Sequence, residues 1–147
     1  MATRDSSKKP FVEDRDSNVS IGIDLPFRKG LGEDGWFATT KDTISAVKNN
    51  IKMLLNTDKG ERIMQPNLGS GLNRFLFEQF TDDVRIAMED EIVTMFRKWL
   101  PFVEIRDIRI KVDAGGEATG KNRLNVYIDF NITKNPNTLE SVSIEIK

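Results

Sequence analysis

Residues 99–113 read WLPFVEIRDIRIKVD, and the spacing of the apolar residues changes within this stretch. Before Pro101, apolar residues recur every three to four positions, which is typical of an amphipathic helix. After it, Ile108, Ile110 and Val112 alternate with charged residues, which predicts a strand with one buried face. Proline disfavours the helical conformation of the residue before it. The stretch therefore divides the chain into a helical part and a following sheet.

The part after Pro101 is expected to form an antiparallel three-stranded meander, because its consecutive strands have short connections. Val103 and Ile105 alternate in the opposite phase to the rest of the first strand, which predicts a bulge near Arg106–Asp107. The segment 113–122 is expected to be a hairpin loop, and Asn135–Pro136–Asn137 a turn. The predicted strands cover residues 107–113, 123–133 and 140–147.

The part before Pro101 is expected to contain three helices, near residues 42–56, 70–79 and 82–100. Asp42 or Thr40 is placed to cap the first helix, Ser70 the second and Thr81 the third. The fold class is α+β, with the helices packed on one face of the meander.

The N-terminal region has a different composition. Residues 1–20 are polar and of mixed charge, which favours a flexible arm ahead of a single domain at 21–147. Ile21, Ile23 and Leu25 give a weak strand pattern. The glycine-rich stretch 28–40 reads as a loop, and Trp36–Phe37 is expected to pin it to the core.

Composition excludes several classes of function. The 147 residues contain no cysteine and no histidine, which removes disulfides, thiolate nucleophiles and the usual zinc ligands. Lys and Arg number 22 and Asp and Glu 23, for a net charge of −1, so we expect no nucleic-acid partner. No apolar run is long enough to span a membrane, and no metal or cofactor is indicated. The N-terminus lacks the apolar centre of a signal peptide, which points to a cytoplasm-like compartment of synthesis.

The stretch GERIMQPNLGSGL, at residues 60–72, has no helical or strand periodicity. One interpretation is catalytic, with Glu61 as the acid of a muramidase-like hydrolase and Asp58 as its partner. Lys59 and Arg62 flank these carboxylates and favour their ionised forms, which is the wrong direction for a general acid. The catalytic interpretation is therefore disfavoured.

The other interpretation of this stretch is structural. Gly60 permits a turn after the first helix, Pro66 fixes the chain direction, and Gly69 allows close backbone approach. Ile63 and Met64 are expected to bury. We expect a latch, in which charged residues pair inward or meet a partner protein, with members Gly60, Glu61, Arg62, Pro66, Gly69 and Leu72.

The last strand leaves one edge of the meander open. Unprotected sheet edges recruit strands from other chains. The alternatives are an ordinary edge strand and a docking edge for a partner strand, formed by Val142, Ser143, Ile144, Glu145 and Ile146.

The order of these motifs over residues 23–147 resembles the sheath-initiator, or baseplate wedge, family of contractile tails. That family includes the small baseplate wedge subunit of T-even-type phages and the TssE component of type VI secretion. Two residues depart from the pattern, Gln65 before the proline and Phe102 after Pro101, where basic residues are common. The matching residues are Leu55, Thr57, Gly60, Glu61, Arg62, Pro66, Gly69, Leu72, Leu76, Phe77, Glu78, Trp99 and Pro101.

The resemblance implies a non-enzymatic protein of a virion tail baseplate, assembled in the host cytoplasm. It implies that the sheet receives strands from the tail sheath protein, and that the latch sits on the wedge core-bundle proteins. Tube or hub proteins are further expected partners. The family has also carried a lysozyme-like label, which keeps the muramidase-like hydrolase as the alternative.

Overall fold

The computed structural model describes residues 11, 14, 16, 18–30, 35–113, 123–133 and 135–146, without the side chains of 112–113 and 135–138. Most of the predicted arm and nearly all of the predicted 113–122 loop lie outside these residues. The chain divides into two compact units, Met1–Ile51 and Lys52–Lys147, and the boundary falls inside helix α1 (Thr43–Asn56).

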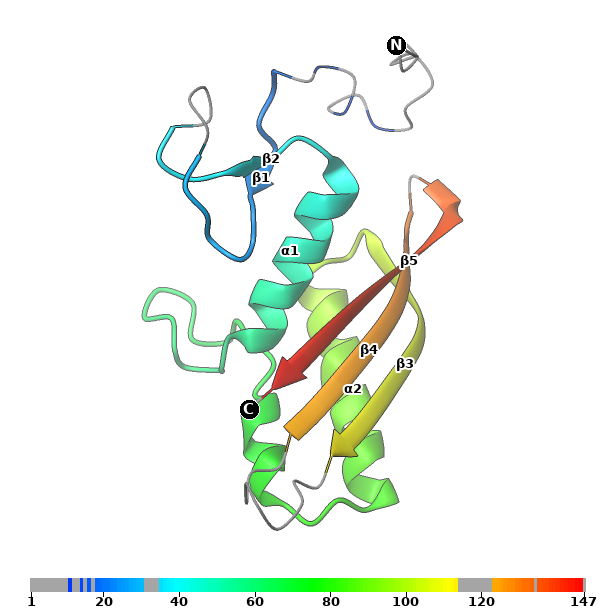
Figure 1. Ribbon diagram of the computed structural model, residues 1–147. Helices are drawn as coiled ribbons and strands as arrows, with labels where there is room; N and C mark the ends of the chain where they lie inside the picture. The colour runs from blue at the N-terminus through cyan, green and yellow to red at the C-terminus, as the bar shows by residue number, and fades with distance from the viewer. Residues whose placement is uncertain are drawn as a thin grey trace. The chain divides into compact units, whose positions relative to one another are not determined.

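The second unit contains the predicted meander. Its strands are β3 (Val103–Asp113), β4 (Arg123–Ile132) and β5 (Asn135–Ile146). They lie in the order β3-β4-β5, and each neighbouring pair is antiparallel (Figure 1). The α+β fold class is therefore confirmed.

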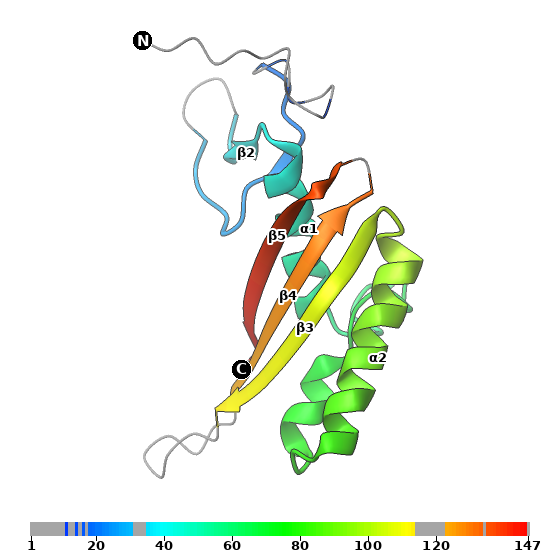
Figure 2. The ribbon, with the colours of Figure 1, turned by 90° about the vertical axis from the view of Figure 1, so that its right-hand side faces the viewer.

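One face of this sheet is buried and the other is polar. Figure 2 shows helix α2 (Asp82–Trp99) running along the sheet on the side of β3. Strand alternation places apolar side chains toward one face only, as expected for an antiparallel sheet that packs on one side. The buried apolar residues of β4 and β5 are Leu124, Val126, Ile128, Phe130, Ile132, Val142, Ile144 and Ile146.

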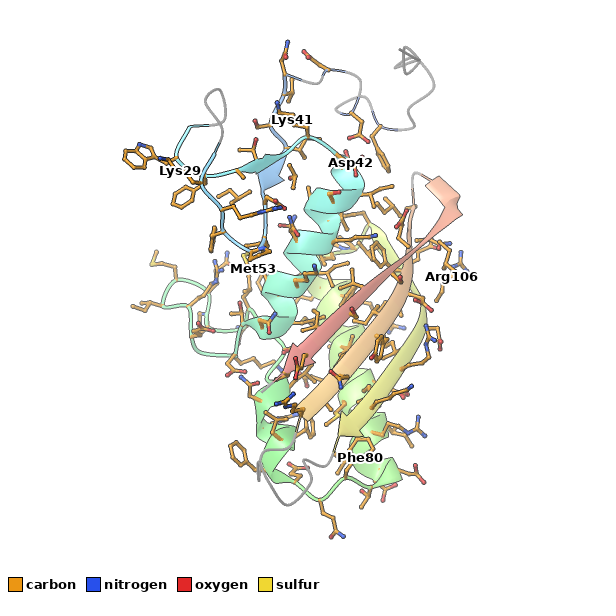
Figure 3. All side chains as sticks on the ribbon, viewed as in Figure 1. Lys29, Lys41, Asp42, Met53, Phe80 and Arg106 are labelled. Carbon is orange, nitrogen blue, oxygen red and sulfur yellow. The ribbon has the colours of Figure 1, made fainter. Side chains whose placement is uncertain are left out.

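The predicted bulge in β3 is confirmed. Ile105 pairs with Phe130 and Asp107 pairs with Asp129, so Arg106 is an extra residue without a register partner. The extra residue puts the apolar residues on its two sides out of phase in the sequence, and the bulge lets them face the same way in the sheet. The Arg106 side chain is exposed and extends away from the sheet (Figure 3).

The predicted turn at Asn135–Pro136–Asn137 is wrong, because β5 already begins at Asn135 and pairs there with Ile132. A register shift between Phe130 and Ile132 lets the chain reverse earlier than the composition suggests. Pro136 is tolerated because β5 is an edge strand of this sheet.

The three helices lie where periodicity places them. The second, η4 (Leu72–Phe77), is a 3₁₀ helix with Gly71 at the N-cap position, at φ +60°. Ser70 lies one residue earlier than expected of a cap, but its hydroxyl accepts a hydrogen bond from the Leu72 amide, the first of the helix, at 3.3 Å. Thr81 caps α2 by accepting a hydrogen bond from the Val84 amide at 3.4 Å. Asp42 accepts one from the Ser45 amide at 3.1 Å in the first turn of α1. No described helix has both the length and the apolar character needed to cross a bilayer.

The first unit contains a short hairpin of β1 (Gly22–Ile23) and β2 (Thr39–Thr40). The Ala38 amide donates to the Arg28 carbonyl at 2.9 Å, and the Gly30 amide to the Trp36 carbonyl at 3.2 Å, so backbone bonds extend the hairpin into the predicted loop. Because these bonds fix the segment, its aromatic residues need not bury. Trp36 is 85% exposed, so the expectation that it pins the loop to the core is wrong.

The start of α1 is bonded to the N-terminal region. Phe11 is buried, and the Asp14 carboxylate accepts hydrogen bonds from the amide and the hydroxyl of Thr43 at 2.8 and 2.6 Å. Within the hairpin, a hydrogen bond from Arg28 holds the pKa of Asp24 below its ordinary value. The flexibility of the 1–20 arm stays a prediction.

Candidate functional site

The 57–71 loop joins α1 to η4 and is closed at its base. The Ser70 amide donates to the Thr57 carbonyl at 2.9 Å, and the Ser70 hydroxyl donates to the Leu55 carbonyl at 2.7 Å. The Ser70 side chain is fully buried, so these bonds are shielded from competing water. The two ends of the loop are thereby held together.

The body of the loop is fixed by further bonds. The Gly60 amide donates to the Pro66 carbonyl at 2.8 Å, and the Glu61 carboxylate accepts from the Asp58 amide at 3.0 Å. The Asn73 amide group donates to the Asp58 carboxylate at 2.6 Å. Because these contacts join positions across the loop, they leave it few alternative conformations.

The loop is also anchored to helix α2. Lys59 forms an ion pair with Glu91, and the Arg74 guanidinium lies 3.6 Å from the other oxygen of the same carboxylate. Glu91 is only 18% exposed, so two cations compensate a carboxylate that is largely removed from water.

Most of the predicted latch residues shape the loop itself, and their role toward a partner stays a prediction. Gly60 adopts φ +91° and Gly69 φ +123°, both in the left-handed region that favours glycine. Glu61 bonds within its own loop, and Leu72 is a core residue. The Arg62 side chain is the exception, since it makes no hydrogen bond or ion pair with another described residue and is exposed. Of the two alternatives, inward pairing of Glu61 with Arg62 is not seen, and contact with a partner stays a prediction.

The tip of the loop carries two large apolar residues that sequence reasoning placed in the core. Ile63 is 94% exposed and Met64 is 92% exposed, so the expectation that they bury is wrong. The local reason is the pair of turns closed by Gln65 to Arg62, at 3.1 Å, and Leu68 to Gln65, at 3.1 Å, which hold the tip outward. The available signal was two adjacent apolar residues without periodicity in a loop rich in glycine and proline.

The geometry at Asp58 and Glu61 does not resemble a glycosidase site. The Glu61 carboxylate is directed at the Asp58 backbone, and the Asp58 carboxylate binds Asn73, so the two do not face each other across a gap for a sugar. Neither hollow described below is lined by them. Among the described residues, no cluster of three or more potential metal-binding side chains occurs.

Two hollows lie beside α2 in the second unit. One, of about 440 Å³, lies between α2 and β3, and is lined by Val93, Phe96, Arg97, Val103, Glu104 and Ile105. The other, of about 170 Å³, lies between α2 and the 57–71 loop, and its lining includes Lys59, Gly69, Glu91, Lys98 and Trp99. The Lys98 ammonium sits 5.2 Å from the centre of the Trp99 ring. Neither hollow combines enclosure with a catalytic group.

The predicted docking edge is regular over most of β5. From Glu140 to Ile146, each residue pairs with one residue of β4 without a register shift. Val142, Ile144 and Ile146 are buried, and Ser141, Ser143 and Glu145 are exposed. In the described sheet, β5 is an edge strand, with a hydrogen-bonded neighbouring strand on one side only.

Comparison with known proteins agrees with these features. Residues 41–137 match the family model described as baseplate wedge protein gp25. The chain belongs to the baseplate wedge protein gp25 family. The resemblance stated from the sequence is therefore confirmed.

Two solved structures are similar to this member of the gp25 family. One is a chain of the anti-feeding prophage baseplate, with 27% identity, a TM-score of 0.61, and coverage of 76% of this chain and 83% of that chain. The other, from Geobacter sulfurreducens, is provisionally described as a tail lysozyme, with 21% identity, a TM-score of 0.59, and coverage of 74% and 94%. The second likeness shows the fold alone. No curated protein matches the chain.

Proposed function

We propose that this gp25-family chain is a non-enzymatic structural protein of a contractile tail baseplate that links the wedge to the first sheath ring. In this role the β5 edge accepts a strand from the tail sheath protein and templates sheath assembly. The 57–71 loop contacts the wedge core-bundle proteins, and tube or hub proteins are further neighbours. The protein assembles in the host cytoplasm and acts in the tail, or in a related injection machine of the type VI kind.

The observation that carries the proposal is the position of β5 at the edge of the described sheet, in a chain of a baseplate family. The opposite edge is less suited to a partner strand. Strand β3 is interrupted by the Arg106 bulge, and its exposed face carries charges, both of which discourage edge pairing. The exposed charged residues of β3 are Glu104, Arg106, Asp107, Arg109 and Lys111.

A strand added to β5 has two sources of affinity. Its backbone can form ladder hydrogen bonds, each worth about 0.5–1.5 kcal/mol net. Its alternate side chains can extend the apolar layer that Val142, Ile144 and Ile146 begin. Several such positions suffice for firm binding without a deep pocket.

Two variants test the edge. Ser143→Pro removes a backbone donor of β5, and Ser141→Lys/Ser143→Lys adds charge to its exposed positions while leaving the backbone intact. We expect both variants to enter baseplates but to stop sheath polymerisation, seen as particles with a tube and no full-length sheath in negative-stain electron microscopy. Circular dichroism first establishes that each variant is folded.

The matched control is Tyr127→Lys. Tyr127 is the register partner of Ser143 on the central strand, so it adds charge to the same face away from the edge. This control is expected to build normal sheath. Full-length sheath on baseplates that contain a folded Ser141→Lys/Ser143→Lys chain would contradict the proposed use of β5.

A further inference from the structure

The tip of the 57–71 loop is unusual among the exposed apolar sites of this chain. Scattered exposed apolar residues are ordinary in soluble proteins. Ile63 and Met64, in contrast, are adjacent, and each is more than nine-tenths exposed. They contribute almost nothing to the core of the second unit, so their apolar surface calls for an explanation outside that core.

The loop holds this tip in one shape before any partner binds. The buried Ser70 hydroxyl closes the base at 2.7 Å, and the Gly60–Pro66 bond at 2.8 Å braces the middle. Lys59 is tied to Glu91 of α2. A preorganised element loses little conformational entropy on binding, which makes its apolar residues effective anchors.

The charge beside the tip indicates the chemistry of the partner. Arg62 directly precedes Ile63, and its guanidinium is not paired with any described carboxylate. The neighbouring Glu61 carboxylate forms no ion pair with it and is directed at the Asp58 amide. A surface complementary to this tip therefore combines an apolar pocket with an acidic rim.

We infer that Ile63 and Met64 insert together into an apolar pocket of a neighbouring baseplate protein, where a carboxylate at the rim pairs with Arg62. The inference rests on the proposed function for the presence of that neighbour. In this inference, most of the binding energy comes from Ile63 and Met64, which are not among the predicted latch residues. Gly60, Gly69, Glu61 and Pro66 hold these two side chains in place.

A protein pocket fits the tip better than a lipid surface. Two side chains and one cation offer little area and charge, whereas stable membrane attachment requires a larger apolar face or a polybasic cluster. The same loop also carries Asp58 and Glu61, which oppose binding to anionic lipids.

A competition experiment tests the inference in the complete tail. Cells that assemble the particle produce wild-type chain and Ile63→Ser/Met64→Ser chain at equal levels, and mass spectrometry compares their ratio in purified baseplates with that in the cell. We expect at least about tenfold depletion of the variant, since truncating buried anchors commonly weakens binding by that factor or more. The urea midpoint of the variant should stay at the wild-type value.

Two controls separate the anchor from general effects. Trp36→Ser removes an apolar residue that is 85% exposed and lies outside the family match, and it should enter baseplates at the wild-type ratio. Arg62→Glu should be depleted, while Arg62→Lys, which keeps the charge, should recover most of the incorporation. Equal depletion of Trp36→Ser, or no depletion of the Ile63/Met64 variant, would overturn the inference.

The alternative occupants give different results. Flotation of the wild-type chain with vesicles of phosphatidylglycerol and phosphatidylethanolamine, if abolished in the Ile63/Met64 variant, would assign the tip to a membrane and overturn the inference. Tip-dependent dimers in sedimentation velocity would assign it to a second copy and also overturn it. If the wild-type chain were absent from baseplates, the proposed function would fail; if only the variant ratio stayed at one, the proposed function would stand without this anchor.

Discussion

Gly69 is the residue whose backbone allows the 57–71 loop to close. Its φ is +123°, and a Cβ atom built there would lie 2.3 Å from the Thr57 carbonyl oxygen. The Thr57 carbonyl already accepts the Ser70 amide, so it cannot move away without breaking the base of the loop. Position 69 therefore requires glycine for two reasons: the close approach of the Thr57 carbonyl and the positive φ angle.

We expect Gly69→Ala to lower the free energy of unfolding by more than about 2 kcal/mol, because strain and a backbone clash act together. Gly60→Ala is the matched control, since Gly60 also has positive φ but open space around its Cα. That variant should lose only about 1 kcal/mol. Urea denaturation measures the free energy of unfolding of both variants. Equal decreases would show that the contact with the Thr57 carbonyl adds no measurable cost at position 69.

For single residues of this loop, the sequence predicted the backbone conformation better than it predicted which side chains are buried. Glycine and proline at 60, 66 and 69 predicted a constrained turn because their conformational preferences are local. The exposure of Ile63 and Met64 was not predictable in this way. It depends on the turns closed by the Gln65 and Leu68 amides, which direct the tip outward, and the apolar residue types alone do not signal that direction.

Strand β3 shows how one inserted residue sets the properties of an element. Arg106 has no partner on β4, and without it Val103, Ile105, Ile108 and Ile110 would alternate without interruption. The inserted residue, with the bulge that accommodates it, is therefore not needed to bury these residues. Its effect is to interrupt one exposed edge of the sheet, which protects that edge from pairing.

Deletion of Arg106 is expected to leave the free energy of unfolding within about 1 kcal/mol of wild type, because the inward set of side chains is kept. The repaired edge should promote self-association, detected as concentration-dependent sedimentation. Deletion of Arg109, at a regular ladder position, reverses the faces of the strand and should unfold the second unit. If the Arg106 deletion variant were stable and monomeric, the bulge would not be the feature that prevents β3 from pairing with other strands.

Periodicity predicted α2 and β4 nearly to the residue, since both carry long one-sided patterns. It failed at the start of β5, where Asn135 and Pro136 are typical turn residues. Their strand conformation is imposed by pairing with β4 through a register shift near Ile132. The residue types at 135–137 do not signal this pairing, because the register shift on β4 decides it.

The whole molecule consists of two units, and the second depends on the buried face of the meander. Ile128, at the centre of β4, has no exposed surface. Ile128→Ala should lower the free energy of unfolding of this unit by about 2–5 kcal/mol, as large-to-small core substitutions do. Ile86→Ala, at a half-exposed position of α2, should change it by less than about 1 kcal/mol. Urea unfolding followed by the far-ultraviolet signal compares the two, and similar losses would contradict this account of the core.

The unbroken β5 ladder also has a mechanical consequence. Its register runs from Glu140 to Ile146 without a shift, so a strand laid along it can engage consecutive positions. If such a strand is pulled along its own length, its backbone bonds bear the load in parallel and must fail together. If it is pulled perpendicular to its length, the hydrogen bonds carry the load one at a time and break in sequence from one end. The direction of pull, more than the number of contacts, then decides whether the joint holds or releases.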